Sequence, residues 1–464
     1  MTDTFDVIVL GAGPAGENVA GRASDNGLTA AIVEPELIGG ECSYWGCIPS
    51  KTLLRPGDVI AAARRVPGAA EAITGRIDAS AAFAQRDYMV SSYDDGGQLP
   101  WLEEKHIELV RGVGRLTGER VVEVTLRDGG TRTLTARRGV VLATGTVPLI
   151  PPVPGLADAA PWTNRDATGA KEVPDRLLVV GGGAIGVEMA QAFRRLGSAE
   201  VTVVEGAPRL LGREEPFASE DVHTAFEAEG IRVIVGHSAA QVRRAAADAP
   251  VTTVLDDGTE IEADEILVAV GRRGHTQDIG LDTVGLTPGR YVEVDDRLRA
   301  VGVDGEWLYA VGDVNGRALL THMGKYQARI AGDVLAGKPL RDIASQDVVP
   351  RVTFTDPQVA AVGLTEAQAR EKYGNVRTAK YPVGGVAGSY VQGNGIGGTA
   401  FLVIDGDRDV IVGATFTGPA IAELLHSATI AIIGEVPLDR LWHAVPSFPT
   451  VSEVWLRLLE GLGL

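Results

Sequence analysis

The chain has 464 residues, of which 45% are hydrophobic, and a formal net charge of −18. A chain of this length exceeds a single hydrophobic core, so we expect about three domains. The acidic balance argues against nucleic acid or an anionic membrane surface as a partner, because both reward a basic face. No apolar run reaches the roughly 18 residues of a membrane span, and the acidic first residues carry no secretory signal, so no membrane association is expected.

The first predicted element is a strand, turn, helix and strand over residues 5–34. The turn reads Gly-Ala-Gly-Pro-Ala-Gly, and the second strand ends on Glu34. In a dinucleotide-binding fingerprint Gly11 allows the tight turn, Gly13 lets backbone amides approach a pyrophosphate, and Gly16 lets the helix pack on the strand. Glu34 can accept hydrogen bonds from ribose hydroxyls. This unit therefore predicts a bound dinucleotide.

Both cysteines of the chain, Cys42 and Cys47, lie within residues 39–51. Two thiols five positions apart on an irregular helical turn can bring their Cα atoms within the roughly 4.4–6.8 Å of a disulfide. A reversible disulfide is the favoured interpretation; the alternatives are two buried structural thiols or half of a metal site. No metal site is predicted, because no second cysteine pair completes it. Two cysteines without an export signal fit the cytoplasm, where a disulfide is more often catalytic than structural.

The region from residue 56 to residue 154 predicts a helical scaffold, a group of strands and a connector. Residues 56–84 are prone to helix and offer no chemistry. Residues 107–142 read as strands separated by turns, and the last strand runs into small residues that let the chain pass close to a ligand. The proline-rich residues 148–154 predict a connector into a second domain.

A second dinucleotide unit covers residues 176–205, with the turn Gly-Gly-Gly-Ala-Ile-Gly and a strand that ends on Glu205. A carboxylate there accepts from a ribose 2′-hydroxyl and repels a 2′-phosphate, which favours NAD(H) over NADP(H). Arg209 and Arg213 follow closely and could contact a phosphate, so the choice between the two nucleotides stays open.

Residues 39–51 resemble the GG-x-C-x3-GCIPSK signature of the class I pyridine nucleotide-disulfide oxidoreductases, a flavoprotein family that includes dihydrolipoamide dehydrogenase and mercuric reductase. The resemblance runs nearly end to end. It implies an α/β fold with two Rossmann-like dinucleotide-binding domains and an α+β dimerisation domain. The implied boundaries are 1–150 with 273–345 for FAD, 151–272 for NAD(P), and 346–464 for dimerisation.

The resemblance also implies the cofactors and the residues that hold them. FAD is expected in the first domain and NAD(H) in the second. The implied FAD contacts are Gly11, Gly13, Gly16, Glu34, Gly40, Lys51, Gly114, Thr144, Gly145, Asp313 and Thr321. The implied nicotinamide nucleotide contacts are Gly181, Gly183, Gly186, Glu205 and Gly271.

Four further roles follow from the resemblance. Cys47 would be the charge-transfer thiolate nearer the flavin, and Cys42 the interchange thiol that meets the acceptor. Lys51 would pair with Glu188 beside the flavin N5, where its cation stabilises negative charge arriving with the hydride. No cysteine lies near Leu464, which excludes routes through a C-terminal cysteine pair.

The chain departs from the family at Phe448. In members that handle dithiols this position holds the histidine that acts as general base, and the glutamate at the place of Glu453 orients it. Phenylalanine cannot take a proton, and a general base typically contributes roughly 10²- to 10⁴-fold. His443 or His426 could replace it, although neither has the family's spacing to Glu453.

The predicted function is an FAD-dependent, dihydrolipoamide dehydrogenase-like disulfide reductase. One alternative is an NAD(P)H:quinone reductase that works directly from the flavin and needs no histidine. A second alternative is a non-catalytic flavin redox sensor. The expected partners are a second copy of the chain, which completes each active site, and a small-molecule disulfide or quinone acceptor.

Overall fold

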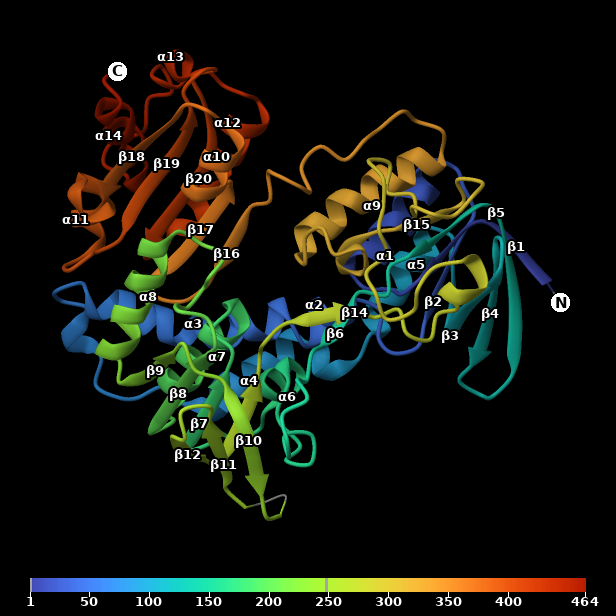
Figure 1. Ribbon diagram of the computed structural model, residues 1–464, viewed down its shortest axis with the longest axis horizontal. Helices are drawn as coiled ribbons and strands as arrows, with labels where there is room; N and C mark the ends of the chain where they lie inside the picture. The colour runs from blue at the N-terminus through green and yellow to red at the C-terminus, as the bar shows by residue number, and fades with distance from the viewer. Residues whose placement is uncertain (1, 247–248) are drawn as a thin grey trace. The chain divides into compact units, whose positions relative to one another are not determined.

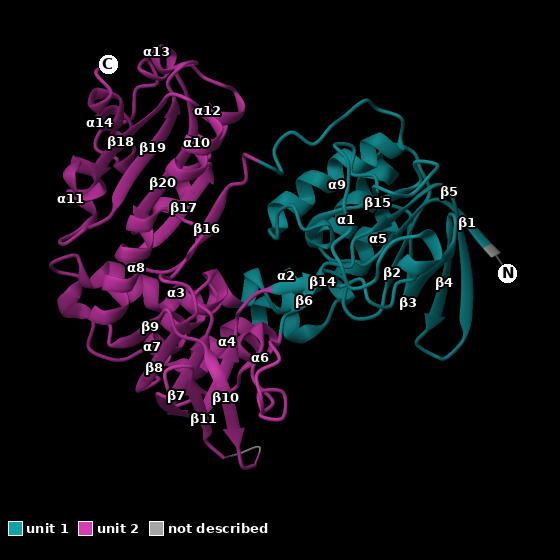
Figure 2. Ribbon diagram, in the orientation of Figure 1, with its two compact units in different colours: residues 1–49, 87–149, 272–346 teal, residues 50–86, 150–271, 347–464 magenta. Residues whose placement is uncertain are grey.

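The structure is a computed structural model that describes residues 2–246 and 249–464. Parallel sheets with helices between their strands confirm the predicted α/β class (Figure 1). The chain forms two compact units of three segments each. Unit 1 holds residues 1–49, 87–149 and 272–346, and unit 2 holds residues 50–86, 150–271 and 347–464 (Figure 2).

Unit 1 is built on a six-stranded sheet around β1, which pairs in parallel with β2 on one side and β5 on the other. β15 pairs in parallel with β5, and β4 runs antiparallel to both β3 and β5. Every residue of β2 is buried, as expected for a parallel strand covered on both faces. The strands of the sheet are β1 (Thr2–Leu10), β2 (Ala30–Glu34), β3 (Ile107–Gly118), β4 (Val121–Leu126), β5 (Thr131–Leu142) and β15 (Leu308–Ala310).

Helix α1 (Pro14–Asp25) follows β1 and packs against α9 (Thr321–Leu335). It begins at Pro14, whose missing N–H is no loss in the first turn of a helix. Arg22 and Asp333 join the two helices by an ion pair of 2.7 Å. The remaining elements wholly within unit 1 are α2 (Gly40–Tyr44), α5 (Leu99–Glu104), β6 (Thr146–Pro148) and β14 (Arg272–Gly274).

Unit 2 contains a four-stranded parallel sheet in the order β13-β7-β8-β9, with α7 (Ala184–Leu196) after β7. A three-stranded antiparallel sheet, β10-β11-β12, belongs to the same unit. The apolar face of α7 shares a hydrophobic core with the strands of the parallel sheet. The elements are β7 (Arg176–Val180), β8 (Glu200–Glu205), β9 (Ile231–Val235), β10 (Ala239–Arg244), β11 (Val251–Leu255), β12 (Glu260–Ala263), β13 (Glu265–Val268), α6 (Asn164–Gly169) and α8 (Pro216–Ala228).

The third segment of unit 2 is an antiparallel sheet covered by helices, in the strand order β16-β17-β20-β19-β18. This region confirms the predicted α+β part of the fold. Buried side chains of β19 and β20 pack with those of α12 and α14. The elements are β16 (Arg351–Thr353), β17 (Gln358–Gly363), β18 (Val376–Pro382), β19 (Thr399–Asp405), β20 (Val410–Gly418), α10 (Glu366–Lys372), α11 (Ala387–Gln392), α12 (Leu425–Ile433), α13 (Leu438–Leu441) and α14 (Val454–Gly461).

Helices α3 (Cys47–Arg64) and α4 (Ala79–Met89) each begin in one compact unit and end in the other. Residues 50–86 are therefore grouped with unit 2, whereas the sequence assigned them to the FAD-binding domain. The three-domain boundaries stay a prediction. Among the described residues, no helix combines the length and the apolar character needed to cross a bilayer.

Candidate functional site

The first glycine turn, between β1 and α1, leaves room for a ligand. Gly11 has a φ of +100°, and a Cβ there would lie 2.5 Å from the carbonyl oxygen of Ala143. A Cβ on Gly16 would overlap the carbonyl oxygen of Gly11. A Cβ on Gly13 would meet nothing within 4 Å, so this face of the turn is open. Close packing on one side and open space at a helix N-terminus fit a dinucleotide pyrophosphate.

Glu34 fixes the first glycine turn through hydrogen bonds to two backbone amides. Its Oε2 accepts a hydrogen bond from the amide of Ala12 at 2.7 Å, and its Oε1 accepts from the amide of Glu36 at 2.7 Å. The side chain is buried, and burial raises the pKa of Glu34. The carboxylate thus has a structural task that the sequence did not reveal. Its contact with a ribose stays a prediction.

The second glycine turn, between β7 and α7, repeats the first. Gly181 has a φ of +111°, a Cβ on Gly186 would overlap the carbonyl oxygen of Gly181, and Gly183 faces open space. Glu205 accepts from the amides of Gly182 at 2.6 Å and Ala207 at 2.7 Å. The geometry fits a second dinucleotide.

Arg209 follows the second turn and is already engaged. Its guanidinium donates to the carbonyl oxygens of Glu214 at 2.8 Å and Gly212 at 3.0 Å. Arg213 is exposed. The arginine nearer to Glu205 in the sequence is therefore tied to backbone in this structure.

Two segments of unit 1, residues 87–149 and 272–346, contribute polar groups near the end of β5. The hydroxyl of Thr144 is buried and has no hydrogen-bond partner among the described residues. Asp313 accepts from the hydroxyl of Thr146 at 3.0 Å, and Thr146 accepts from Arg272 at 2.7 Å. Burial raises the pKa of Asp313. A buried hydroxyl at the end of β5 without a partner in the described part of the chain fits a bound polyhydroxylated cofactor such as FAD.

Thr146 and Arg272 were missed by the sequence reasoning. Each lies next to a predicted residue: Thr146 after Gly145, and Arg272 after Gly271. Their juxtaposition comes from the antiparallel pairing of β6 with β14, which places Arg272 opposite Pro148. A sequence pattern alone gives no register for two such short strands.

Three other predicted glycines have different surroundings. A Cβ on Gly40 would lie 2.7 Å from the Cα of Gly13, so this residue lets the chain pass the first turn closely. A Cβ on Gly114 would lie 2.7 Å from Leu10 and 3.1 Å from Val33, which gives this position in β3 a packing reason. Gly271 has a φ of +142° and open space around it.

The two cysteines lie on either side of a break between two helices. Cys42 belongs to α2, and Cys47 is the first residue of α3. Neither is in a disulfide; Cys42 is partly buried and Cys47 is exposed. The sulfur of Cys47 lies 3.4 Å from the hydroxyl oxygen of Thr321, at the start of α9. The neighbouring Cys47 side chain and burial raise the pKa of the Cys42 thiol.

An aromatic cluster lies beside the thiols. Trp45, between the two cysteines, stacks on Tyr93 with ring centroids 6.1 Å apart, and Tyr44 lies 5.7 Å from Trp45. Tyr93 ends a turn in which Ser91, Ser92 and Tyr93 all have a positive φ. Nothing in the sequence indicates a left-handed turn without glycine, so Tyr93 was missed.

Lys51 and Glu188 form an ion pair of 2.7 Å within unit 2. Glu188 has a buried side chain and also accepts a hydrogen bond from the amide of Phe354 at 2.9 Å. The ammonium of Lys51 lies 4.9 Å from the centroid of the Phe354 ring. Lys51 is thus held by a carboxylate and an aromatic face; its role at the flavin stays a prediction.

The C-terminal segment holds Phe448 and Glu453, at the places of the histidine and glutamate of the dithiol-handling members. Phe448 is 76% exposed. Glu453 accepts a hydrogen bond from Arg457 at 2.7 Å, and its second oxygen is buried without a partner among the described residues. Both Phe448 and Glu453 line a cavity of about 150 Å³. His426 and His443 are exposed.

A separate surface group brings ligand atoms of His237, Asp256 and Asp257 within 4.8 Å of one another. The ring of His237 lies 2.8 Å from Asp256, and the hydrogen bond to this carboxylate raises the pKa of His237. The three residues form an exposed ion-pair cluster.

Comparison with protein families gives two matches. The model described as pyridine nucleotide-disulphide oxidoreductase matches residues 5–328. The dimerisation domain of the same description matches residues 349–458.

The chain is similar to individual enzymes over nearly its whole length. It is 35% identical to the dihydrolipoyl dehydrogenase of Chlorobaculum tepidum, over 97% of this chain and 95% of that enzyme. It is 30% identical to a mercuric reductase of Staphylococcus aureus, over 97% of this chain and 81% of that enzyme.

Among solved structures, the chain resembles the Cu(II) complex of the HOCl-induced flavoprotein disulfide reductase RclA from Escherichia coli. The TM-score is 0.86, and the alignment covers 99% of each chain. Because the sequence identity is 23%, this likeness shows the shared fold alone.

Proposed function

The chain belongs to the pyridine nucleotide-disulphide oxidoreductase family, and on this premise we propose that it reduces a small-molecule disulfide with electrons from NADH. The family implies FAD and a pyridine nucleotide as cofactors, and the two glycine turns fit them. The observation that carries the proposal is the pair Cys42 and Cys47, which lie on two consecutive helices with Cys47 at the start of α3. The family matches favour this activity over the quinone reductase and redox sensor alternatives.

The chemistry that FAD supplies when bound is two-electron transfer between a dihydronicotinamide and a disulfide. The reduced cysteine pair then exchanges with the substrate. The thiolate of Cys42 attacks one substrate sulfur, the substrate S–S bond breaks, and a mixed disulfide forms. Cys47 displaces the second substrate thiol and restores the Cys42–Cys47 disulfide. Two electrons and two protons leave with the substrate.

The positions of the two cysteines support this division of work. Cys47 opens α3, where the N-terminal end of the helix favours a thiolate. The raised pKa of Cys42 keeps the proton on Cys42 when the pair carries one negative charge. Substrate exchange therefore requires a group that takes the proton of Cys42.

Lys51 is proposed to stabilise negative charge that arrives with the hydride, and Glu188 to orient it. The 2.7 Å ion pair and the contact with Phe354 support this assignment, because they restrict a long side chain to one direction.

The roles proposed for the glycines, Thr144 and Asp313 in cofactor binding rest on the geometry of the two turns and of the β5 end. The role proposed for Thr321 rests on its position at the start of α9, 3.4 Å from the sulfur of Cys47.

NADH is proposed as the nucleotide in preference to NADPH. Glu205 ends β8 beside the second turn, where a carboxylate repels a 2′-phosphate. Arg209, which could have bound that phosphate, donates to two backbone carbonyls instead.

A cytoplasmic homodimer with FAD, NAD(P) and dimerisation domains is proposed as the working form. The dimerisation-domain match over residues 349–458 supports the dimer. The presence of just two cysteines, both in the redox segment, supports a reducing compartment.

The proton route is proposed to differ from that of the histidine-containing relatives. Phe448 is exposed, and Glu453 pairs with Arg457. We expect Phe448→His to raise lipoamide reduction about 10-fold or more, because a general base contributes roughly 10²- to 10⁴-fold. Steady-state NADH oxidation with lipoamide measures the gain. An unchanged rate would mean that another group carries the proton.

The experiment that tests the proposed function is an anaerobic titration of the FAD-loaded protein with NADH, followed by thiol counting in denaturant. One equivalent of NADH should produce two new thiols before the visible flavin absorbance falls. The matched variant Cys42→Ser should show the loss of flavin absorbance from the first equivalent and reduce lipoamide at least 100-fold more slowly. Flavin bleaching without new thiols in the unmodified protein would contradict the proposal.

A further inference from the structure

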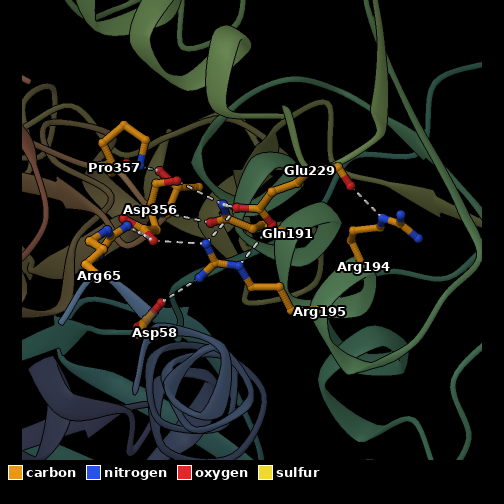
Figure 3. Close-up of polar contacts among 9 residues, drawn as sticks. Asp58, Arg65, Gln191, Arg194, Arg195, Glu229, Asp356 and Pro357 are labelled. Atoms are coloured by element: carbon orange, nitrogen blue, oxygen red, sulfur yellow. Dashed lines mark hydrogen bonds and ion pairs between the residues drawn. The ribbon is translucent and has the colours of Figure 1, made fainter. Parts of the chain in front are cut away.

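Arg195, on α7, is the centre of a polar cluster within unit 2 (Figure 3). Its side chain is 13% exposed, and its guanidinium contacts three carboxylates. The distances are 3.3 Å to Asp58, 2.6 Å to Glu229 and 3.0 Å to Asp356. Arg65 contacts the same carboxylate of Asp356 at 2.5 Å. The cluster therefore joins α3, α7, the end of α8 and the segment before β17.

The same face of α7 holds the segment 354–356 at three points. Glu188 accepts from the amide of Phe354 at 2.9 Å. Gln191, which is fully buried, accepts from the amide of Asp356 at 2.7 Å and donates to its carbonyl oxygen at 3.0 Å. Arg195 completes the strip at the Asp356 side chain.

Helices α3 and α7 are joined by two ion pairs of opposite polarity. Lys51 and Asp58 are seven positions apart on α3, and Glu188 and Arg195 are seven positions apart on α7. Lys51 pairs with Glu188, and Asp58 with Arg195. Seven residues are two helical turns, so both pairs lie along one seam.

The packing between these ion pairs leaves little freedom. Gly57 lets the helices approach, because a Cβ there would lie 2.6 Å from the Cδ of Arg195. Leu54 is buried in the same hydrophobic core as the apolar side chains of α7. A slip of either helix by one residue would separate both charge pairs at once.

The cluster holds more negative than positive charge. Asp58, Glu229 and Asp356 face the guanidiniums of Arg195 and Arg65. Burial raises the pKa of Asp58 to about 6, which means that ionised Asp58 costs stability at neutral pH. A charge that costs stability can be retained because it fixes one arrangement among several.

We propose that Arg195 and Asp58 are positioning residues for Lys51: the hydrogen bond from Arg195 to Asp58 sets the register of α3 against α7 in which Lys51 meets Glu188 and Phe354. The inference rests on the proposed function for what Lys51 does. The register that it assigns to α3 can be tested without turnover.

The test measures how fast limiting acetic anhydride acetylates the Lys51 side chain, which reacts as the neutral amine and releases acetate and a proton. The site is resolved by mass spectrometry of the FAD-loaded protein. Asp58→Ala removes the carboxylate on α3 that contacts Arg195, while the ion pairs of Arg195 with Glu229 and Asp356 remain. We expect Lys51 to react about threefold faster, the scale of losing one partly exposed ion pair. Asp58→Asn should restore the wild-type rate, because its amide oxygen can still accept from Arg195.

The matched control is Arg194→Met. Arg194 lies on the same helix but donates to the backbone carbonyls of Glu229 and Ser198. Lys51 should react in this variant as in the wild type. Equal labelling in Asp58→Ala and wild type would overturn the inference, and so would equal acceleration in Arg194→Met.

The two proposals fail separately. If Lys51→Met left NADH-dependent disulfide reduction unchanged, the proposed role of Lys51 would be wrong, whatever the labelling shows. If Lys51 were acetylated at the same rate in Asp58→Ala and in the wild type, the register proposal would be wrong, whatever the activity shows.

Discussion

The two glycine turns have nearly the same local geometry and different surroundings. In both, the first glycine has a φ near +100° and the last one approaches the carbonyl oxygen of the first. In both, a glutamate at the end of the second strand accepts from an amide within or beside the turn. The repetition shows that this unit is set by local backbone requirements.

The helices that follow the two turns contact different parts of the chain. Helix α1 packs on α9 and forms an ion pair through Arg22. Helix α7 carries the buried polar strip of Glu188, Gln191 and Arg195, which binds α3 and the segment 354–356. The turns share one backbone geometry, whereas the face of the helix that follows each turn determines which other segments contact it.

The largest effect is expected where the first turn is closed. In Gly16→Val the new side chain would overlap the carbonyl oxygen of Gly11 and force α1 away from β1. We expect at least a 100-fold loss of FAD affinity, because the amides at the helix N-terminus would no longer face the pyrophosphate. Flavin absorbance relative to protein measures it. Normal FAD content would contradict the tight packing of this turn.

The matched change in the second turn should impair the use of NADH without impairing the binding of FAD. Gly186→Val closes the turn before α7 and leaves the turn before α1 untouched. We expect the protein to keep its FAD while kcat/KM for NADH falls about 100-fold, which stopped-flow flavin reduction can follow. If Gly186→Val also lost FAD, the two turns would not be independent sites.

A smaller effect is expected from the acidic residue of the second turn. Glu205→Ala removes the carboxylate that repels a 2′-phosphate, so the ratio of kcat/KM for NADPH to that for NADH should rise about 10-fold. Glu34→Ala is the control in the first turn and should leave this ratio unchanged. A constant ratio in Glu205→Ala would show that another group selects the nucleotide.

The smallest effect is expected on the free energy of unfolding, when Asp58 between α3 and α7 is replaced. From pH about 4 to about 6, folded Asp58 keeps a proton that the unfolded chain has lost, so stability falls as the pH rises through this window. Asp58→Asn removes the cost and should raise the free energy of unfolding by about 1 kcal/mol at pH 8. The ~3 kcal/mol of a two-unit shift is the upper bound of this gain, because the raised pKa of Asp58 already includes the attraction of Arg195.

Urea unfolding of the FAD-loaded proteins at pH 8 and pH 4 measures this difference. The advantage of Asp58→Asn should shrink at pH 4, where Asp58 is protonated when folded. The same advantage at both pH values would show that ionisation of Asp58 is not its cause.

Much of the fold could be predicted because its signals are local. The strands 176–180 and 200–205 have the bounds that their apolar runs indicate. The spacing of Cys42 and Cys47 predicts an irregular helical turn, and the structure has a break between two helices there. The pairing of β6 with β14 was not predicted, because three-residue strands carry too little pattern to set a register.

Some site residues carry a signal in the sequence. Lys51 with Asp58 and Glu188 with Arg195 repeat opposite charges at a spacing of seven, which suggests two helices in register. The composition of residues 56–84 by itself predicts only scaffold. Tyr93 had no such signal, because its left-handed turn contains no glycine.

The sequence by itself determined the nucleotide turns, the thiol pair and the absence of a histidine at Phe448, because these depend on residue identity at short range. Only the tertiary structure decided that Glu34 and Glu205 hold backbone amides, that Glu453 pairs with Arg457, and that Asp58 meets Arg195. The physical reason is that a charged side chain has several partners within reach along the chain. The folded backbone and the packing around each carboxylate select the one that compensates its burial.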